Sequence, residues 1–199
     1  MLSLEEIFQA RNRLVPYVYH TPLLHLHALD PLLGCQVYVK AECMQLTHSF
    51  KIRGALNRIL QLTPEERARG VVTASSGNHG RGVAYAAKML GIKATVVIPD
   101  HAPAVKIQAV RDLGAEVILC DKPKRFAIAE KLRDEKGLCY IPPFNDYAVM
   151  AGQGTIALEI FQDLPDPAAV LVPLGGGGLT SGIATAIKGC LSYFNFPGN

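Results

Sequence analysis

Lys51 is the residue of this sequence whose type and surroundings best fit chemistry. It lies in the run SFKIRGA at residues 49–55. A lysine amine forms a Schiff base with an aldehyde, so a lysine in a suitable pocket can hold a carbonyl cofactor. Most lysines, however, are solvated surface charges. The hypothesis of a catalytic lysine therefore depends on two glycine-bearing loops farther along the chain.

The first of these loops is TASSGNHG at residues 73–80. It follows the apolar pair Val71-Val72 and precedes an Ala-rich amphipathic stretch at 83–90, an order that predicts strand, turn and helix. Small residues let backbone N–H groups face a ligand, and a helix start adds partial positive charge, so the turn suits a carboxylate or a phosphate. An ordinary helix cap with turn glycines is the simpler interpretation of this loop taken alone.

The second loop is the tetraglycine run Gly175 to Gly178, between an apolar run at 169–174 and a helix-like stretch at 179–188. We expect 169–174 to be a buried strand. Four consecutive glycines carry a large entropy cost on folding, and close approach of the backbone to a phosphate explains them. The run lacks the Gly-Lys-Ser/Thr ending of an ATP loop and the spacing of a dinucleotide fingerprint, so a compact monophosphate fits better than ATP or NAD.

These three stretches together resemble the fold-type II family of pyridoxal-phosphate enzymes, in the branch of threonine and serine dehydratases and serine racemase. AGQGT at residues 151–155 is similar to another segment of this branch. The resemblance runs from about Thr21 to Lys188. It implies pyridoxal 5'-phosphate as the cofactor and a tryptophan synthase β-like α/β fold with two parallel or mixed sheets flanked by helices. The family's C-terminal part is missing after Lys188, so we expect a truncated larger domain.

The resemblance also implies roles for individual residues. Lys51 and Ser76 are the expected catalytic residues. Cofactor contacts are expected from Phe50, Lys51, Asn78, Gly175, Gly176, Gly177, Gly178 and Leu179. Substrate contacts are expected from Ser75, Ser76, Gly77 and His79. Without the resemblance, Phe50 could equally well be an aromatic residue of the core. We expect His79 to be a helix-start residue with no role in proton transfer. We expect Arg53 to be a cation on the surface.

The family chemistry begins with removal of the substrate Cα proton, after which a Cβ hydroxyl leaves as water and the product hydrolyses to a 2-oxo acid and ammonia. We therefore expect a hydroxy-amino-acid ammonia-lyase acting on L-threonine or L-serine. Racemisation of serine with a side eliminase activity is the alternative, because Ser76 resembles the racemase arrangement where many dehydratases carry alanine. A catalytically impaired, truncated α/β module is a further alternative. The sequence does not rank threonine, serine and hydroxyaspartate as substrates.

The composition narrows the partners. Of 199 residues, 49% are hydrophobic, and 20 Lys+Arg against 17 Asp+Glu give a net charge of +3 without a basic run. This charge balance disfavours nucleic acids and membrane surfaces as partners and favours a small substrate. The resemblance implies that the protein forms a homodimer. Five cysteines without a C-x-x-C pair argue against disulfides and zinc, so no metal is expected. No signal-like N-terminus or run of ~20 apolar residues occurs, which predicts a cytoplasmic protein.

The elements that must position these residues follow from periodicity. Apolar runs alternate with helical stretches from residue 71 onward, a pattern typical of a parallel sheet covered on both faces. The expected strands are 36–42, 71–73, 94–98, 116–120, 139–141 and 169–174, and the expected helices are 3–14, 50–62, 79–90, 103–113, 123–136, 147–162 and 179–188. We expect a small substrate-loop domain at 70–144 and a larger, incomplete cofactor-binding domain at 1–69 and 145–199. The active site should lie between them.

Overall fold

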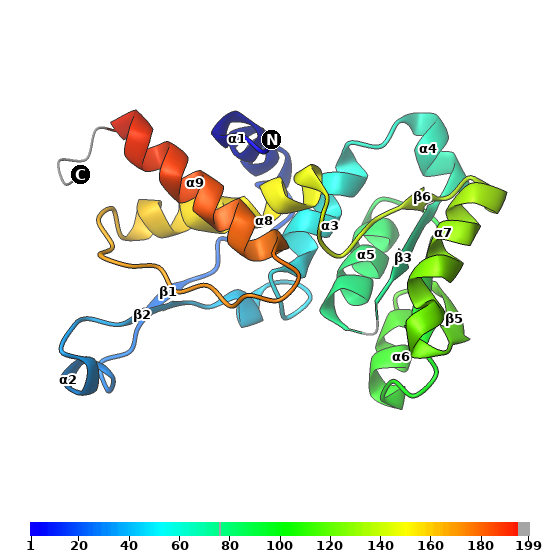
Figure 1. Ribbon diagram of the computed structural model, residues 1–199, viewed down its shortest axis with the longest axis horizontal. Helices are drawn as coiled ribbons and strands as arrows, with labels where there is room; N and C mark the ends of the chain where they lie inside the picture. Colours follow the sequence, from blue (N-terminus) through cyan, green and yellow to red (C-terminus); the bar gives the residue numbers. More distant parts are fainter. Residues whose placement is uncertain (76, 195–199) are drawn as a thin grey trace.

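The computed structural model describes residues 1–75 and 77–194 of the chain. It places a group of helices beside a parallel sheet that carries its own helices (Figure 1). The helices are α1 (Leu4–Leu14), α2 (Asp30–Leu33), α3 (Lys51–Leu60), α4 (Pro64–Arg69), α5 (Asn78–Met89), α6 (Ala104–Arg111), α7 (Arg125–Lys136), α8 (Tyr147–Asp163) and α9 (Gly178–Phe194). The strands are β1 (Leu23–His25), β2 (Tyr38–Lys40), β3 (Val71–Ala74), β4 (Ala94–Pro99), β5 (Glu116–Cys120) and β6 (Cys139–Tyr140).

The parallel sheet has the strand order β5-β4-β3-β6. Its central strands β3 and β4 are buried along their whole length, which is why they appear in the sequence as continuous apolar runs rather than alternating ones. Val72 and Val97 pack under α7, whereas Val71 and Val96 belong to the apolar cluster on the face of α5 and α6 (Figure 1). The predicted parallel sheet with helices on both faces is confirmed.

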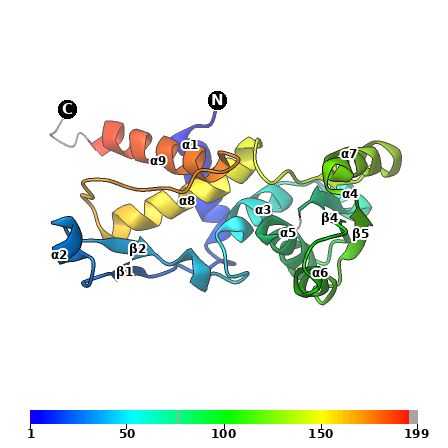
Figure 2. The same cartoon turned by 60° about the horizontal axis from the view of Figure 1, so that its bottom comes forward.

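The second sheet differs from the expectation of parallel or mixed pairing. It consists of β1 and β2 alone, which pair antiparallel with Leu24 opposite Val39. The chain between them is short and carries only the single-turn helix α2, which brings the second strand back alongside the first in the opposite direction. The predicted strand 36–42 shortens to β2, whose Lys40 pairs with Glu159 and Asp163 of α8. Helix α2 lies at the end of the ribbon that is farther from the parallel sheet (Figure 2).

The predicted buried strand at 169–174 is wrong. Within the described part of the chain this segment pairs with no strand. Leu171 and Leu174 are 92% and 75% exposed. An apolar run becomes a sheet strand only where a neighbouring strand accepts and donates its backbone hydrogen bonds, and the described fold provides none beside this segment.

Helix α8 is the centre of the helical group and packs against α1, α3 and α9. Its glycines allow close crossings. A Cβ on Gly152 would lie 2.5 Å from the Arg53 carbonyl oxygen on α3, and a Cβ on Gly154 would lie 2.8 Å from the Gly182 carbonyl oxygen on α9. The AGQGT segment singled out in the sequence therefore has a packing reason, because it brings the backbone of α8 against two neighbouring helices.

Helix α3 connects the two halves of the molecule, between α8 and α5 (Figure 2). Its residues Ile52, Leu56 and Ile59 share an apolar cluster with Val83 of α5 and Val96 of β4. A second apolar cluster is formed by α1, α8 and α9. The core on one face of the parallel sheet thus extends into residues assigned to the larger domain, and the domain division at 69/70 and 144/145 remains a prediction.

Arg53 is not the surface cation that we favoured from the sequence. Its side chain is 1% exposed. Its guanidinium donates to both oxygens of Glu42, at 2.9 and 2.8 Å, and to Glu159 Oε2 at 2.9 Å. The helical spacing of α3 turns position 53 toward Glu159 of α8 and toward Glu42, which follows β2, and these two carboxylates compensate for its burial. Burial lowers the pKa of Arg53, but the hydrogen bonds to Glu42 and Glu159 outweigh it and raise that pKa above its ordinary value.

Two further observations bear on the expectations from composition. All five cysteines are free thiols, two of them exposed and one buried. Within the described residues, no helix combines the length and the apolar composition needed to cross a membrane.

Candidate active site

Three helices begin at one cavity. Lys51 is the first residue of α3, Asn78 the first of α5 and Gly178 the first of α9. The cavity has a volume of about 550 Å³. It is lined by Phe50, Lys51, Ser75, Asn78, His79, Pro143, Phe144, Pro173, Leu174, Gly175, Gly176, Gly177, Gly178, Leu179 and Thr180. Since the first N–H groups of a helix lack partners inside the helix and carry partial positive charge, this convergence suits an anionic ligand.

The cavity gathers most of the residues that the sequence singled out. Gly77 immediately precedes α5 and does not line the cavity. Ser76 lies outside the described residues, so its predicted catalytic role has no structural account. Sequence reasoning missed Pro143 and Phe144. They follow β6, which is parallel to β3, and therefore lie at the same edge of the sheet as Ser75. The rule that parallel strands end at one edge, where ligands bind, could have identified them from the sequence.

Lys51 lies in this cavity with its amine half-buried. Its Nζ donates a hydrogen bond of 2.8 Å to the Pro143 carbonyl oxygen and lies 5.3 Å from the centroid of the Phe50 ring. Burial lowers the pKa of Lys51 below its ordinary value. The start of a helix acts in the same direction, because its positive end disfavours an ammonium. A larger share of the amine is therefore neutral and nucleophilic at a given pH.

His79 is a neutral imidazole at the wall of the cavity. It is 2% exposed, and its Nε2 lies 3.0 Å from the Ile141 carbonyl oxygen. Because only a protonated nitrogen can donate to that oxygen, Nδ1 carries the lone pair, and Nδ1 has no hydrogen-bond partner within the described residues. Burial lowers the pKa of His79 to about 4, the hydrogen bond to Ile141 opposes that shift, and the charge of Lys51 adds to it.

The loop before α5 presents small polar groups to the cavity. Ser75 Oγ accepts a hydrogen bond of 3.2 Å from the Gly77 N–H. Asn78 is exposed. The N–H groups at the start of α5 lack acceptors inside the helix, so this loop offers several donors to a carboxylate.

The loop before α9 requires glycine at two positions, for two different physical reasons. A Cβ on Gly176 would fall into the ring of Phe144. Gly177 has φ +85°, a left-handed conformation that side chains other than glycine rarely adopt. Gly175 and Gly177 also have open space where a side chain would be. The loop is therefore a cradle without side chains, at the start of a long helix.

The sequence profile of one protein family, described as pyridoxal-phosphate dependent enzyme, matches residues 14–195. The chain belongs to this family. It is 49% identical over 190 residues to the L-threonine ammonia-lyase of Thermotoga maritima. The aligned region covers 94% of this chain and 47% of that protein. It is 42% identical to a serine racemase of Oryza sativa subsp. indica, over 94% of this chain and 56% of that one.

Solved structures agree with the family assignment. The fold matches maize serine racemase with a TM-score of 0.92 at 40% identity, over 95% of this chain and 58% of the maize chain. The protein thus has the fold-type II architecture of the pyridoxal-phosphate enzymes, as predicted. It spans about half the length of the curated relatives that it matches.

The cavity fits the family's cofactor. Its volume of about 550 Å³ lies within the ~300–1,000 Å³ that is usual for small-molecule sites. The depressed pKa of Lys51 suits bonding to an aldehyde, and the side-chain-free cradle at the start of α9 suits a phosphate. Phe50 offers an aromatic face at the cavity wall. In a pyridoxal-phosphate enzyme these are the residues that would hold the group.

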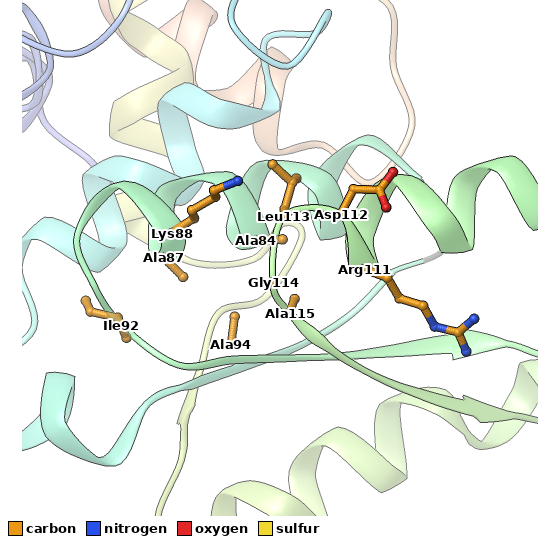
Figure 3. Close-up of a pocket in the computed structure, with 10 residues that line it drawn as sticks. All are labelled: Ala84, Ala87, Lys88, Ile92, Ala94, Arg111, Asp112, Leu113, Gly114 and Ala115. Carbon is orange, nitrogen blue, oxygen red and sulfur yellow. The ribbon is translucent and has the colours of Figure 1, made fainter.

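A second cavity, of about 360 Å³, lies elsewhere in the parallel-sheet region. Its lining includes the ends of α5 and α6, the start of β4 and the residues just before β5 (Figure 3). Lys88 projects across it, while Arg111 points away (Figure 3). It lies at the edge where strands begin, whereas ligands of parallel sheets bind where strands end. It therefore takes no part in the site described here.

The depressed pKa of His79 predicts a pH-dependent stability. The folded-state pKa of about 4 lies below the ordinary value of 6.5. The unfolded chain therefore binds the proton first, and the stabilisation present above pH 6.5 is lost as the pH falls toward 4. Between pH 7.5 and pH 5 this amounts to about 2 kcal/mol of unfolding free energy. Urea unfolding at both pH values measures it.

The matched variants for this test are His79→Asn and His48→Asn. His48 is exposed and has φ 56°, a conformation that asparagine adopts well. We expect His79→Asn to flatten the pH dependence of unfolding relative to wild type and His48→Asn to leave it nearly unchanged. Equal pH dependence in wild type and His79→Asn would show that His79 is not held neutral by its burial.

Proposed function

We propose that this protein dehydrates and deaminates L-threonine or L-serine to a 2-oxo acid and ammonia with pyridoxal phosphate as cofactor. The observation that carries this proposal is the amine of Lys51, with its depressed pKa, in a cavity onto which the starts of α3, α5 and α9 open. The relatives named L-threonine ammonia-lyase support it. When bound, pyridoxal phosphate supplies an electron sink for the pair left by the substrate Cα proton.

Each side chain has a task in this proposal. The amine of Lys51 would hold the cofactor at its aldehyde and, in its neutral form, would take the substrate's Cα proton. Gly175 to Gly178 and Leu179, with the first N–H groups of α9, hold the phosphate. Phe50 and Asn78 also line the cavity and would contact the cofactor, Phe50 through its aromatic ring and Asn78 through its amide.

The substrate's carboxylate would lie at the start of α5. The Ser75 hydroxyl and the first N–H groups of α5 would provide donors there, while the Gly77 N–H donates to Ser75 Oγ and holds the loop. His79 lines the same wall as a neutral group whose Nδ1 accepts hydrogen bonds but carries no proton to give. Phe144 and Leu174 supply apolar surface that keeps water from the reacting carbon.

Serine racemisation with a side eliminase activity is the second candidate. It is favoured by the type of residue 76, a serine, whose hydroxyl is a group that can exchange a proton. The serine racemase of Oryza sativa and the maize serine racemase structure also support it. Both reactions use the same lysine, and they differ in whether the Cβ hydroxyl leaves or the proton returns.

One assay separates these functions. The purified chain is mixed with pyridoxal phosphate and supplied with L-threonine or L-serine, and the 2-oxo acid formed is measured. Chiral analysis of the recovered serine reports racemisation. We expect 2-oxo acid from both substrates. Formation of D-serine without 2-oxo acid would favour the racemase, whereas a cofactor spectrum with neither product would indicate the catalytically impaired module and contradict our proposal.

We further propose a small domain at 70–144, a larger one at 1–69 and 145–199, a homodimeric assembly and a cytoplasmic location. The separate apolar cluster of α1, α8 and α9 supports the division. Leu24 and Val39, paired on β1 and β2 and both exposed, support an assembly that covers them. The five free thiols support a reducing compartment.

A further inference from the structure

Three side chains with metal-binding atoms meet at the end of the β1–β2 ribbon. They are His25 at the end of β1, His27 in the following turn and Asp30 at the start of α2. One ligand atom from each lies within 4.8 Å of the other two. The views in Figures 1 and 2 both place α2 at the far end of the ribbon, away from the parallel sheet, so this group is separate from the Lys51 cavity.

The cluster is held in place before any ion binds. Asp30 accepts the Val37 N–H at 2.9 Å on one carboxylate oxygen and lies 2.7 Å from His25 Nε2 with the other. The His25 ring stacks on Tyr38 at a centroid distance of 4.6 Å and lies 3.7 Å from the His27 ring. The rings of His25 and His27 and the carboxylate of Asp30 therefore already lie together, and each of the three side chains offers one ligand atom to a shared ion.

We propose that His25, His27 and Asp30 form a Zn²⁺ site with a water molecule as the fourth ligand. Imidazole nitrogen and carboxylate oxygen are ordinary zinc ligands, and a tetrahedral ion at ~2.0–2.2 Å separates its ligand atoms by roughly 3.4 Å. The His25–Asp30 pair at 2.7 Å would therefore widen by a side-chain rotation when the ion binds between the two groups. His25 and Asp30 are partly buried and His27 is exposed, which leaves a path for entry.

The ion would connect three parts of the ribbon. His25 belongs to β1 and Asp30 to α2, and through the Val37 N–H the carboxylate of Asp30 also holds the start of β2. Zinc would thus stabilise this end of the molecule, because an ion that binds only the folded state shifts the unfolding equilibrium. The expectation of no metal considered only the cysteines, and it missed the His-x-His-x-x-Asp spacing.

The test uses the full 199-residue chain with Cys35 and Cys43 replaced by serine, since these exposed thiols would also bind zinc. Zn²⁺ binding is measured by titration calorimetry, and Co²⁺ serves as a spectroscopic probe of the ligand type. We expect one equivalent of Zn²⁺, a raised melting temperature, and a visible Co²⁺ spectrum of nitrogen and oxygen ligands. The absence of Zn²⁺ binding by this Cys35→Ser, Cys43→Ser chain would overturn the proposal.

His27→Ala and His101→Ala are the matched variants. His101 is exposed and lies 3.3 Å from Asp100, so it belongs to a histidine–aspartate pair, and it is not among the residues that form the cluster. We expect His27→Ala and Asp30→Asn each to weaken Zn²⁺ binding at least tenfold and His101→Ala to leave it unchanged. Because His27 is exposed, its variant keeps the fold even if Asp30→Asn loosens the ribbon. Equal affinities of His27→Ala and His101→Ala would refute the site.

Discussion

Replacing Lys51 with alanine is expected to abolish the visible absorbance band of bound pyridoxal phosphate and to lower turnover by at least ~10³-fold. Lys51 is the only lysine among the residues that line the cavity in the described part of the chain. Its amine therefore serves both to bond the aldehyde and to move the Cα proton. Absorbance titration measures the first role. Peptide mass analysis after borohydride treatment then locates the cofactor on residue 51.

Two variants make this result specific. Lys106→Ala removes an exposed lysine on α6 that does not line the cavity, and should leave both the band and the turnover intact. Lys51→Arg keeps a cation of similar length but offers no amine to the aldehyde, so it should behave like Lys51→Ala. A band of wild-type intensity in either Lys51 variant would remove Lys51 from the mechanism.

Replacing Arg53 with methionine is expected to lower the free energy of unfolding by about 3–5 kcal/mol. Arg53 is 1% exposed and pairs with Glu42 and Glu159, of which Glu159 is itself buried. Without the guanidinium, Glu159 keeps Lys40, whose Nζ lies 2.9 Å from its Oε2, whereas Glu42 keeps the neutral hydroxyl of Thr21 at 2.6 Å and loses its cation partner Arg53. Denaturant unfolding measures the change.

Compensating substitutions test the cause. Adding Glu42→Gln and Glu159→Gln to Arg53→Met removes both carboxylate charges and should recover part of the lost stability. Arg133→Ala is the matched control, because it breaks an exposed pair with Asp134 at 2.8 Å, and solvent screening should leave the free energy of unfolding nearly unchanged. If the triple variant is no more stable than Arg53→Met, charge burial is not the cause.

This ion-pair network also bears on the site. Arg53 stands two residues after Lys51 on α3 and ties that helix to Glu159 of α8 and to Glu42 after β2. The start of α3, which carries the lysine, is thereby fixed against two other elements. The neutral amine and the cradle of α9 can face the same cavity only while α3 and α8 keep this relative position.

The parallel sheet and its helices were predictable because their signals are local. Strands buried on both faces need continuous apolar residues, as at Val71-Val72, and the glycines at 91, 114 and 137 adopt the positive φ typical of helix C-termini. The segment at 169–174 carries a similar apolar signal and forms no strand, because pairing depends on a neighbour that no local pattern reveals.

The sequence by itself determined the residue types that make the candidate site: an amine at position 51, small polar residues at 75–79 and bare backbone at 175–178. Only the tertiary structure decided that these segments meet at one cavity, that Pro143 and Phe144 join them, and that Arg53 turns inward to its carboxylates. The physical reason is that burial, helix direction and charge compensation arise between elements distant in the chain, whereas composition and periodicity report only on neighbours.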